Sequence, residues 1–172
     1  MFRQRGFTII ELLVTLAVLG IAAAVALPNL TYFIAKERVS TSASELINSL
    51  ATARVEATKL NINIVVIPAR NATDGWSDGW CVGPATIANC SDAAVIRNYQ
   101  SRGAGVTIDS PYLQTGSRLT FRRDGTLLSG VSAQSFTVTS PKLRADDATA
   151  RCISVNVLGK ASMKKANRDD NC

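Results

Sequence analysis

Only a few residues of this chain could do chemistry, and the first is a single acid inside an apolar block. Glu11 lies within residues 7–27, which contain no other charged residue. A carboxylate inside the hydrocarbon of a membrane costs a few kcal/mol at the centre and less near an interface. Because such an acid is usually functional, Glu11 is a candidate site residue.

Four cysteines, Cys81, Cys90, Cys152 and Cys172, form a second group of reactive side chains. None has C-x-x-C spacing, so neither a zinc ribbon nor a thioredoxin-like motif is supported. An even number of cysteines in a chain exported past a membrane indicates two disulfides, and four cysteines allow three pairings. We prefer Cys81–Cys90 and Cys152–Cys172 because each closes a local loop, the second one holding a polar tail. Free thiols in a cytosolic protein are the alternative.

Catalysis has little support in the residue types. The chain has no histidine, which removes the commonest general base and a common metal ligand. It has no phosphate-binding G-x-x-x-x-G-K-[ST] loop, and nothing marks out a Ser–Lys pair. We therefore expect a protein without enzymatic activity, cofactor or metal.

Basic residues could bind a polyanion. The chain carries 19 Lys and Arg against 13 Asp and Glu, and the excess lies late in the sequence. Such a surface attracts nucleic acid or anionic lipid, although a solvated basic surface has the same composition. The candidates for binding DNA phosphates are Arg122, Arg123, Lys160, Lys164, Lys165 and Arg168. Because no aromatic residues are interleaved with them and two aspartates follow Arg168, DNA binding is the second function class rather than the first.

Residues 7–27 form the element that carries Glu11. The block is long and apolar enough to cross a bilayer, and Arg3 and Arg5 before it keep that end cytoplasmic. The rest of the chain would then face the periplasm. A cleaved secretory signal ending near the small residues 22–26 is the alternative. We favour a retained anchor because an acid is poor in the apolar core of a signal, and because the helical pattern continues further.

A long helix is predicted from about residue 7 to about residue 60. Beyond the apolar block, apolar residues recur at alternating steps of four and three, which places them on one helical face. This stripe consists of Val39, Ala43, Leu46, Leu50, Ala53, Ala57 and Leu60. Residues 28–60 are therefore the amphipathic half of the helix and residues 7–27 its transmembrane half, with a kink expected at Pro28.

Residues 61–172 follow as a β-rich globular part. Short runs of alternating or β-branched apolar residues predict strands, separated by polar, turn-rich loops at 71–78 and 140–149. The predicted strands are residues 63–68, 79–83, 95–99, 105–108, 118–123, 126–128, 135–139, 152–158 and 161–164, with a hairpin turn at residues 124–125. We therefore predict an α+β fold in which an antiparallel sheet packs its apolar face on the stripe of the helix.

The string GFTIIELLV, residues 6–14, resembles the cleavage and methylation signature of type IV prepilins and type II secretion pseudopilins. The resemblance is dense over residues 6–28. It implies that residues 1–6 are a leader, that a prepilin peptidase cuts between Gly6 and Phe7, and that the new amine of Phe7 is methylated. In that family the acid at the position of Glu11 pairs with the N-terminal amine of a neighbouring subunit, which would supply the buried carboxylate with a cation.

Three stretches of the globular part are similar to one branch of minor pilins. Residues 74–80 (DGWSDGW) resemble its Trp-rich loop and strand, residues 119–126 (LTFRRDGT) its Phe-x-x-x-Gly hairpin, and residues 153–160 (ISVNVLGK) its last strand and turn. The branch holds the H-type minor pseudopilin of type II secretion, GspH, and the FimT and FimU minor pilins. Where it often has Gly-Arg-x-Arg, this chain has GKASMKK at residues 159–165, which keeps the charge but not the spacing.

These resemblances imply a subunit that enters the inner membrane by a single pass, with a periplasmic C-terminal domain, and then joins a type IV pilus or a type II secretion pseudopilus. A subunit of the minor branch would help to initiate that filament. The implied partners are other minor and major pilins or pseudopilins, the prepilin peptidase and the inner-membrane assembly platform. Some FimT-like proteins are linked to DNA uptake, so a tip pilin that binds DNA during natural transformation is the alternative.

Overall fold

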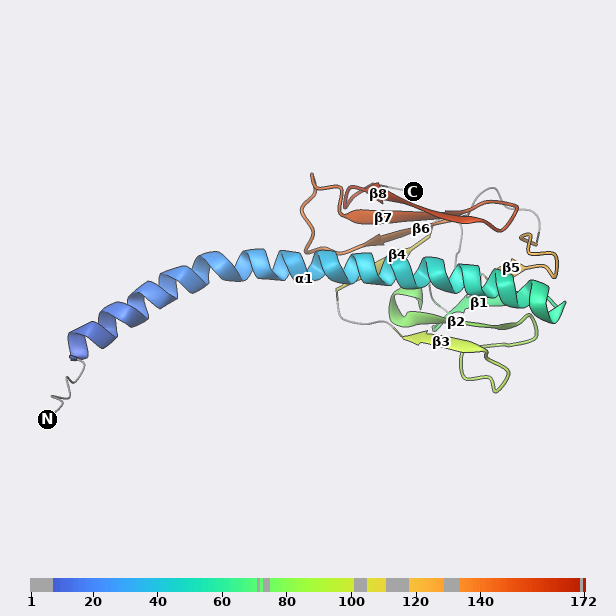
Figure 1. Cartoon of the computed structure of the whole chain (residues 1–172), viewed down its shortest axis with the longest axis horizontal. Helices are drawn as coiled ribbons and strands as arrows, with labels where there is room; N and C mark the ends of the chain where they lie inside the picture. The colour runs from blue at the N-terminus through green and yellow to red at the C-terminus, as the bar shows by residue number, and fades with distance from the viewer. Residues whose placement is uncertain are drawn as a thin grey trace, which may run out of the picture.

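The computed structural model describes residues 8–70, 72, 75–100, 105–110, 118–128, 134–170 and 172. Within them, a long helix lies along two antiparallel sheets (Figure 1). The elements are α1 (Ile9–Leu60), β1 (Ile64–Pro68), the 3-10 helix η1 (Gly75–Asp78), β2 (Gly79–Pro84), β3 (Arg97–Gln100), β4 (Thr107–Asp109), β5 (Leu119–Phe121), β6 (Gln134–Thr139), β7 (Ala150–Val155) and β8 (Ala161–Ala166). The predicted α+β fold, a long N-terminal helix packed on antiparallel strands, is confirmed.

The helix α1 continues through Pro28 without interruption, and its axis bends over the blue, N-terminal part (Figure 1). It ends at Leu60, and the residue that caps it, Asn61, has left-handed backbone angles with φ of 54°. The stripe from Val39 to Ala57 is buried as predicted. Leu60 does not belong to it, because the helix ends there and leaves this side chain 45% exposed.

The strands form two four-stranded sheets rather than the single sheet predicted. The first has the order β3-β2-β1-β5 and the second β4-β6-β7-β8, and all neighbouring strands are antiparallel. Both sheets turn apolar residues toward α1, so the stripe is covered from two sides. The residues that complete this core include Ile64, Val66, Leu119 and Phe121 from the first sheet, and Phe136, Val138, Ile153 and Val155 from the second.

Two predicted strands differ from those in the structure. Residues 126–128 pair antiparallel with residues 120–122 as predicted, but only as an isolated bridge between Phe121 and Leu127. The N–H of Leu128 donates to the carbonyl of Thr120 (2.8 Å), whereas the N–H of Leu127 donates to the carbonyl of Val157 (3.0 Å). The strand predicted over residues 152–158 ends at Val155 because the next residues form a turn. In this turn the N–H of Gly159 donates to the carbonyl of Asn156 (2.8 Å).

A tryptophan-rich stretch joins the two sheets to the helix. Trp80 of β2 donates its indole N–H to the hydroxyl of Ser49 on α1 (2.7 Å), which satisfies a buried donor. Trp76 of η1 packs edge to face on Phe136 of β6, with ring centroids 5.0 Å apart. The predicted loop at 71–78 therefore contributes a buried side chain to the core, in addition to a turn.

Two disulfides hold the periphery of the fold. The structure joins Cys81 to Cys90 and Cys152 to Cys172, the two local pairings that the sequence favoured, with Cα–Cα distances of 5.5 and 5.6 Å. The first lies in a small cluster with Ile87 on the side of the first sheet that faces away from the main core. The second ties the C-terminal tail to β7. Loops of this length stabilise a fold by about 3 kcal/mol each when chain entropy alone is counted.

Candidate functional site

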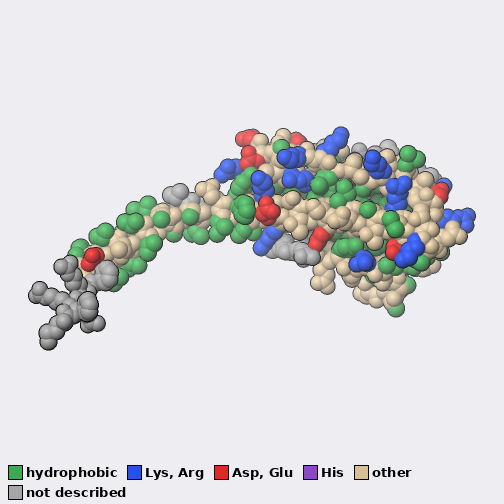
Figure 2. All heavy atoms as spheres, in the orientation of Figure 1, with side chains coloured by type: hydrophobic (Ala, Val, Ile, Leu, Met, Phe, Trp, Pro, Cys, Tyr) green, Lys and Arg blue, Asp and Glu red, His purple; other side chains and the backbone are tan. Residues whose placement is uncertain are grey.

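The N-terminal part of α1 presents a long exposed apolar surface. Its apolar side chains are exposed on all sides, from Ile9 (82% exposed) to Phe33 (57% exposed). Figure 2 shows this surface as an arm of green side chains and tan atoms with a red acidic side chain near its N-terminal end, whereas the other charged side chains on this face lie over the globular part. By length and composition, α1 is the one described helix that could cross a membrane. The arrangement requires an apolar environment outside the chain, since a water-exposed surface of this size is otherwise an aggregation hazard.

Glu11 takes part in a capping box at the start of α1. Its N–H donates to the hydroxyl oxygen of Thr8 (3.3 Å), and its carboxylate accepts the N–H of Thr8 (3.4 Å). The carboxylate therefore points back toward the N-terminal end of the helix, where the helix dipole also favours negative charge. We did not foresee this contact, although the pattern Thr-x-x-Glu at residues 8–11 signals it. Gly6 and Phe7 lie outside the described residues, so cleavage and methylation there stay predictions.

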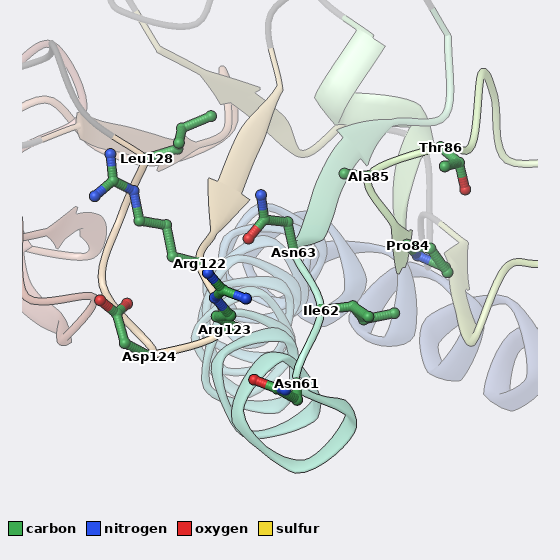
Figure 3. A pocket seen from close by; sticks show the side chains of 10 residues that line it. All are labelled: Asn61, Ile62, Asn63, Pro84, Ala85, Thr86, Arg122, Arg123, Asp124 and Leu128. Atoms are coloured by element: carbon green, nitrogen blue, oxygen red, sulfur yellow. The ribbon is translucent and has the colours of Figure 1, made fainter.

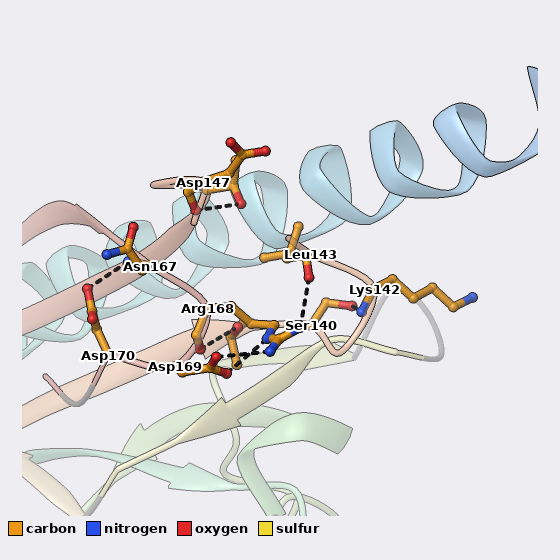
Figure 4. A network of polar contacts seen from close by, with 10 residues as sticks. Ser140, Lys142, Leu143, Asp147, Asn167, Arg168, Asp169 and Asp170 are labelled. Atoms are coloured by element: carbon orange, nitrogen blue, oxygen red, sulfur yellow. Dashed lines mark hydrogen bonds and ion pairs between the residues drawn. The ribbon is translucent and has the colours of Figure 1, made fainter. Parts of the chain in front are cut away.

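Where the exposed part of α1 meets the globular part, the loop after β6 (residues 140–149) contacts the helix. Tyr32 donates its hydroxyl to Asp147 (2.6 Å), and the guanidinium of Arg144 lies 4.6 Å from the centre of the Tyr32 ring. Arg144 also donates to the side-chain oxygen of Asn29 (3.3 Å). We call Asn29, Tyr32, Arg144 and Asp147 the neck; Figure 4 shows Asp147 beside α1. The neck fixes the helix where its exposed part becomes its buried part.

The hydrogen bond to Asp147 raises the pKa of Tyr32, and burial and the negative charge of Asp147 act in the same direction. The hydroxyl therefore stays protonated and able to donate over a wider pH range than that of a free tyrosine.

At the opposite end, two motif glycines meet beside the last turns of α1. Both have positive φ, 81° at Gly125 and 74° at Gly159, a conformation that favours glycine. A Cβ built on Gly159 would overlap the carbonyl oxygen of Gly125. Arg54 of α1 donates to that same oxygen (3.1 Å). The hairpin at residues 119–126 and the turn at residues 153–160 are thus joined to each other and to the helix.

The six cations proposed for DNA do not form one patch. Arg122 and Arg123 line an open pocket at the C-terminal end of α1 (Figure 3). Lys164 and Lys165 of β8 line a different open pocket, together with Cys152 and Asp170. Figure 2 shows Lys and Arg side chains dispersed over the visible face. The remaining member of the β7–β8 region, Lys160, follows Gly159 in the turn.

Arg168 in particular is already engaged. Its Nε and Nη2 atoms donate to the two carboxylate oxygens of Asp169 (2.9 Å each), and Nη1 donates to the carbonyl of Leu143 (3.2 Å). Figure 4 shows this network. The hydrogen bonds and charge of Asp169 raise the pKa of Arg168, and those of Arg168 lower the pKa of Asp169. The cation therefore serves to fasten the C-terminal tail onto the loop after β6.

Residues 75–79 (GWSDG) match the pattern G-x-S-x-G, the nucleophile motif of many hydrolases. Here Ser77 lies in η1, and its hydroxyl accepts the N–H of Ile108 (2.9 Å) and donates to the carbonyl of Ile108 (3.3 Å). The motif normally sits on a strand-to-helix turn with a histidine base, and the chain has no histidine. The hydroxyl joins η1 to β4 and is not presented as a nucleophile.

Comparison with known proteins identifies the family. The family model described as type II transport protein GspH matches residues 42–159, and the prokaryotic N-terminal methylation motif matches residues 1–27. The chain belongs to the GspH family. This confirms the predicted resemblance to the branch that holds GspH and FimU.

Two crystal structures of the type IV minor pilin FimU of Pseudomonas aeruginosa have the same fold. Their TM-scores are 0.58 and 0.59 at 22% and 24% identity, over 73% and 80% of this chain and 91% and 95% of theirs. The type IV major pilin PilA of Myxococcus xanthus is 32% identical over 63% of this chain and 56% of its own length. The type IV major fimbrial protein FimA of Dichelobacter nodosus is 48% identical over 42 residues, 27% of its length. The chain thus spans about half or less of the length of these sequence relatives.

Proposed function

We propose that this GspH-family protein is a minor pilin or pseudopilin, which is held in the inner membrane and then incorporated into a type IV pilus or a type II secretion pseudopilus. Its role is structural, without catalysis or a cofactor, and it helps to initiate the filament. The observation that carries the proposal is the division of α1. The stripe up to Ala57 is buried by the two sheets, whereas the large apolar side chains that the structure describes from Ile9 to Leu27 are exposed.

Before assembly, the membrane supplies that partner. Leu, Ile, Val and Phe side chains in residues 7–27 favour insertion by about 0.3 to 0.6 kcal/mol each near the centre of the bilayer. The globular part then lies in the periplasm, where disulfides such as Cys81–Cys90 persist. We propose that a prepilin peptidase removes residues 1–6 on the cytoplasmic side and that the amine of Phe7 is methylated.

During assembly, the arms of neighbouring subunits replace the lipid. Apolar side chains pack between helices, and Glu11 needs a cation because a lone carboxylate in this environment is costly. The N-terminal amine of Phe7 on a neighbouring subunit supplies that charge. The capping box with Thr8 supports this pairing, because it directs the Glu11 carboxylate toward the end of the helix where such amines would lie.

The partners of this subunit would be other minor and major pilins or pseudopilins and the inner-membrane assembly platform. The family model points to type II secretion, and the structural relatives named FimU point to type IV pili. The proposal therefore includes both the type IV pilus and the type II secretion pseudopilus. Arg122 and Arg123 line one pocket, Lys164 and Lys165 line another, and Arg168 is bound to Asp169, so the six cations give no reason to prefer DNA uptake as the function.

Substitution of Glu11 by alanine tests the proposal. We expect membrane retention to be unchanged, because a charge is removed from an apolar segment, and incorporation into sheared filaments to fall at least about tenfold. Glu37→Ala is the matched control, since Glu37 is an exposed acid on the same helix beyond the apolar block. Immunoblots of membrane and filament fractions measure both quantities. Normal amounts of the Glu11→Ala protein in filaments would contradict the proposed assembly role.

A further inference from the structure

The two disulfides lie in different surroundings. Cys81 is fully buried, and its disulfide with Cys90 belongs to an apolar cluster that includes Ile87. Cys152 and Cys172 are both half-buried, and both line an open pocket of about 370 Å³, which we call the disulfide pocket. Because thiol–disulfide exchange requires a thiolate to reach a sulfur atom, the second disulfide is the more accessible of the two.

The disulfide pocket carries an excess of positive charge. Its lining contains two cations, Lys164 and Lys165 of β8, and one acid, Asp170. The carboxylate of Asp170 accepts the backbone N–H of Asn167 (2.8 Å), so it is engaged within the tail. A recess with this charge attracts an anion, and the reactive form of a thiol is the thiolate anion.

Lys164 lies directly opposite Cys152 in the antiparallel register of β7 and β8. Side chains at directly opposite positions leave the same face of a sheet, with Cβ atoms about 4.5 to 5.5 Å apart. The ammonium group of Lys164 is therefore within reach of the Cys152 sulfur. A cation at this position favours the thiolate form of Cys152 and offsets the cost that partial burial imposes on that charge.

We propose that the Cys152–Cys172 bond is a site of thiol–disulfide exchange, at which a protein dithiol opens and closes the bond with the aid of Lys164. The Cys81–Cys90 bond stays closed because its surroundings are apolar and Cys81 is buried. The partner would be a periplasmic thiol oxidoreductase. Only this identity of the partner rests on the proposed function, since the reactivity of the bond follows from the fold.

The attack is expected at Cys172. Cys172 lies outside the strands, whereas Cys152 is held in β7 between β6 and β8 and packs against the main core. A thiolate of the partner forms a bond with the sulfur of Cys172, the bond between Cys172 and Cys152 breaks, and Cys152 leaves as a thiolate beside Lys164. A leaving thiol with a lower pKa leaves faster, so Lys164 speeds this step.

The second thiol of the partner completes the exchange. It attacks its own mixed disulfide, which releases Cys172 and leaves the partner oxidised to a disulfide. Two electrons pass from the partner to the chain, the partner loses its two thiol protons to water, and Cys152 and Cys172 each take one up. The reverse sequence closes the bond again.

Opening the bond would free the tail and leave the core intact. Besides the disulfide, polar contacts hold the tail, including the hydrogen bonds from Arg168 to the carbonyl of Leu143 and from Thr139 to the carbonyl of Arg168 (3.2 Å each). Cys152 remains in β7, whose backbone pairing with β6 and β8 does not need the disulfide. Exchange at this site therefore changes the attachment of the tail without unfolding the domain.

The test is reduction of the folded full chain in detergent micelles, with dithiothreitol in one series and reduced thioredoxin, a protein dithiol, in a second. Samples are quenched with N-ethylmaleimide at intervals, and peptide mass spectrometry measures the labelled fraction of each cysteine. In both series we expect Cys152 and Cys172 to be labelled at least about tenfold faster than Cys81 and Cys90, because access limits exchange. Tryptophan fluorescence, recorded in parallel, should stay that of the folded chain.

A pair of single variants isolates the contribution of the cation. We expect K164Q to open the bond about threefold more slowly, because the leaving thiol of Cys152 loses the neighbouring charge that lowers its pKa. The matched control is K160Q. Lys160 is an exposed lysine at the turn of the same hairpin and does not belong to the lining of the disulfide pocket, so K160Q should open the bond at the unsubstituted rate.

Three outcomes would overturn the inference: equal labelling of the two disulfides, no opening by thioredoxin until the tryptophan fluorescence reports unfolding, or equal rates for K164Q and K160Q. The assembly proposal fails separately. If E11A enters filaments normally while the bond exchanges as expected, the assembly role of Glu11 is wrong and the exchange site remains. If E11A is excluded from filaments and the bond does not exchange, only the exchange site is wrong.

Discussion

The two parts of α1 differ in where they find their partners. From Val39 to Ala57, every stripe residue is covered by strands of the same chain. From Ile9 to Phe33, equally apolar side chains are exposed. One continuous helix therefore belongs to two different environments, and the neck around Tyr32 marks the boundary between them.

This division explains how one chain can be both a folded domain and an assembly unit. The apolar stripe of the buried part requires no partner outside the chain, since strands of the two sheets cover it. The exposed part contributes nothing to that core, so it can exchange lipid for other helices without unfolding the domain. The comparison predicts that equal changes in the two parts have unequal effects.

The largest expected contrast comes from the same substitution at two leucines. Leu50→Ala removes a fully buried side chain of the stripe and should lower the free energy of unfolding by about 2 to 5 kcal/mol. Leu16→Ala lies in the exposed part and should leave that free energy unchanged. Urea denaturation of the full chain in detergent, followed by the fluorescence of the buried Trp76 and Trp80, measures both. Equal losses would mean that the arm is part of the folded core.

A glycine pair gives a smaller contrast of the same kind. Gly159→Ala should lower the free energy of unfolding by about 2 to 3 kcal/mol, because φ is 74° and the added methyl would overlap the carbonyl of Gly125. Gly20 has nothing within 4 Å of an added Cβ, so Gly20→Ala should not destabilise the domain. The same denaturation experiment compares them. Tolerance of alanine at position 159 would show that the two turns can move apart.

The sequence predicted both parts of α1 because their signals are local. A block without charges other than Glu11 and a stripe with steps of three and four can be read from neighbouring residues. Most strands were found for the same reason. The return strand predicted at 126–128 is reduced to one bridge between Leu127 and Phe121, and the N–H of Leu127 binds the carbonyl of Val157, a partner far along the chain.

The division into two sheets, the neck and the open pocket at the C-terminal end of α1 could not be predicted, because each depends on residues far apart in the sequence. Tyr32 and Asp147 are separated by 115 residues, and no pattern links them. The pocket needs three segments between residues 61 and 128. The capping box of Thr8 and Glu11 is different, since the spacing Thr-x-x-Glu is itself the local signal for it.

The smallest predicted effect concerns the boundary itself. The raised pKa of Tyr32 means that the folded chain holds this proton more tightly than the unfolded chain does. The neck therefore contributes stability below the ordinary tyrosine pKa of 10.0, and this contribution is lost as pH rises through the higher folded value. Tyr32→Phe removes the hydroxyl but keeps the ring under Arg144, so it should lower the unfolding midpoint slightly at pH 7 and reduce its fall above pH 10. Thermal unfolding of the unsubstituted protein and of Tyr32→Phe across that pH range measures the difference.

Tyr99, which stacks on Trp80 at a ring distance of 5.7 Å, offers the matched control Tyr99→Phe. If the two variants show the same alkaline profile, the bond between Tyr32 and Asp147 does not fasten the exposed arm to the domain.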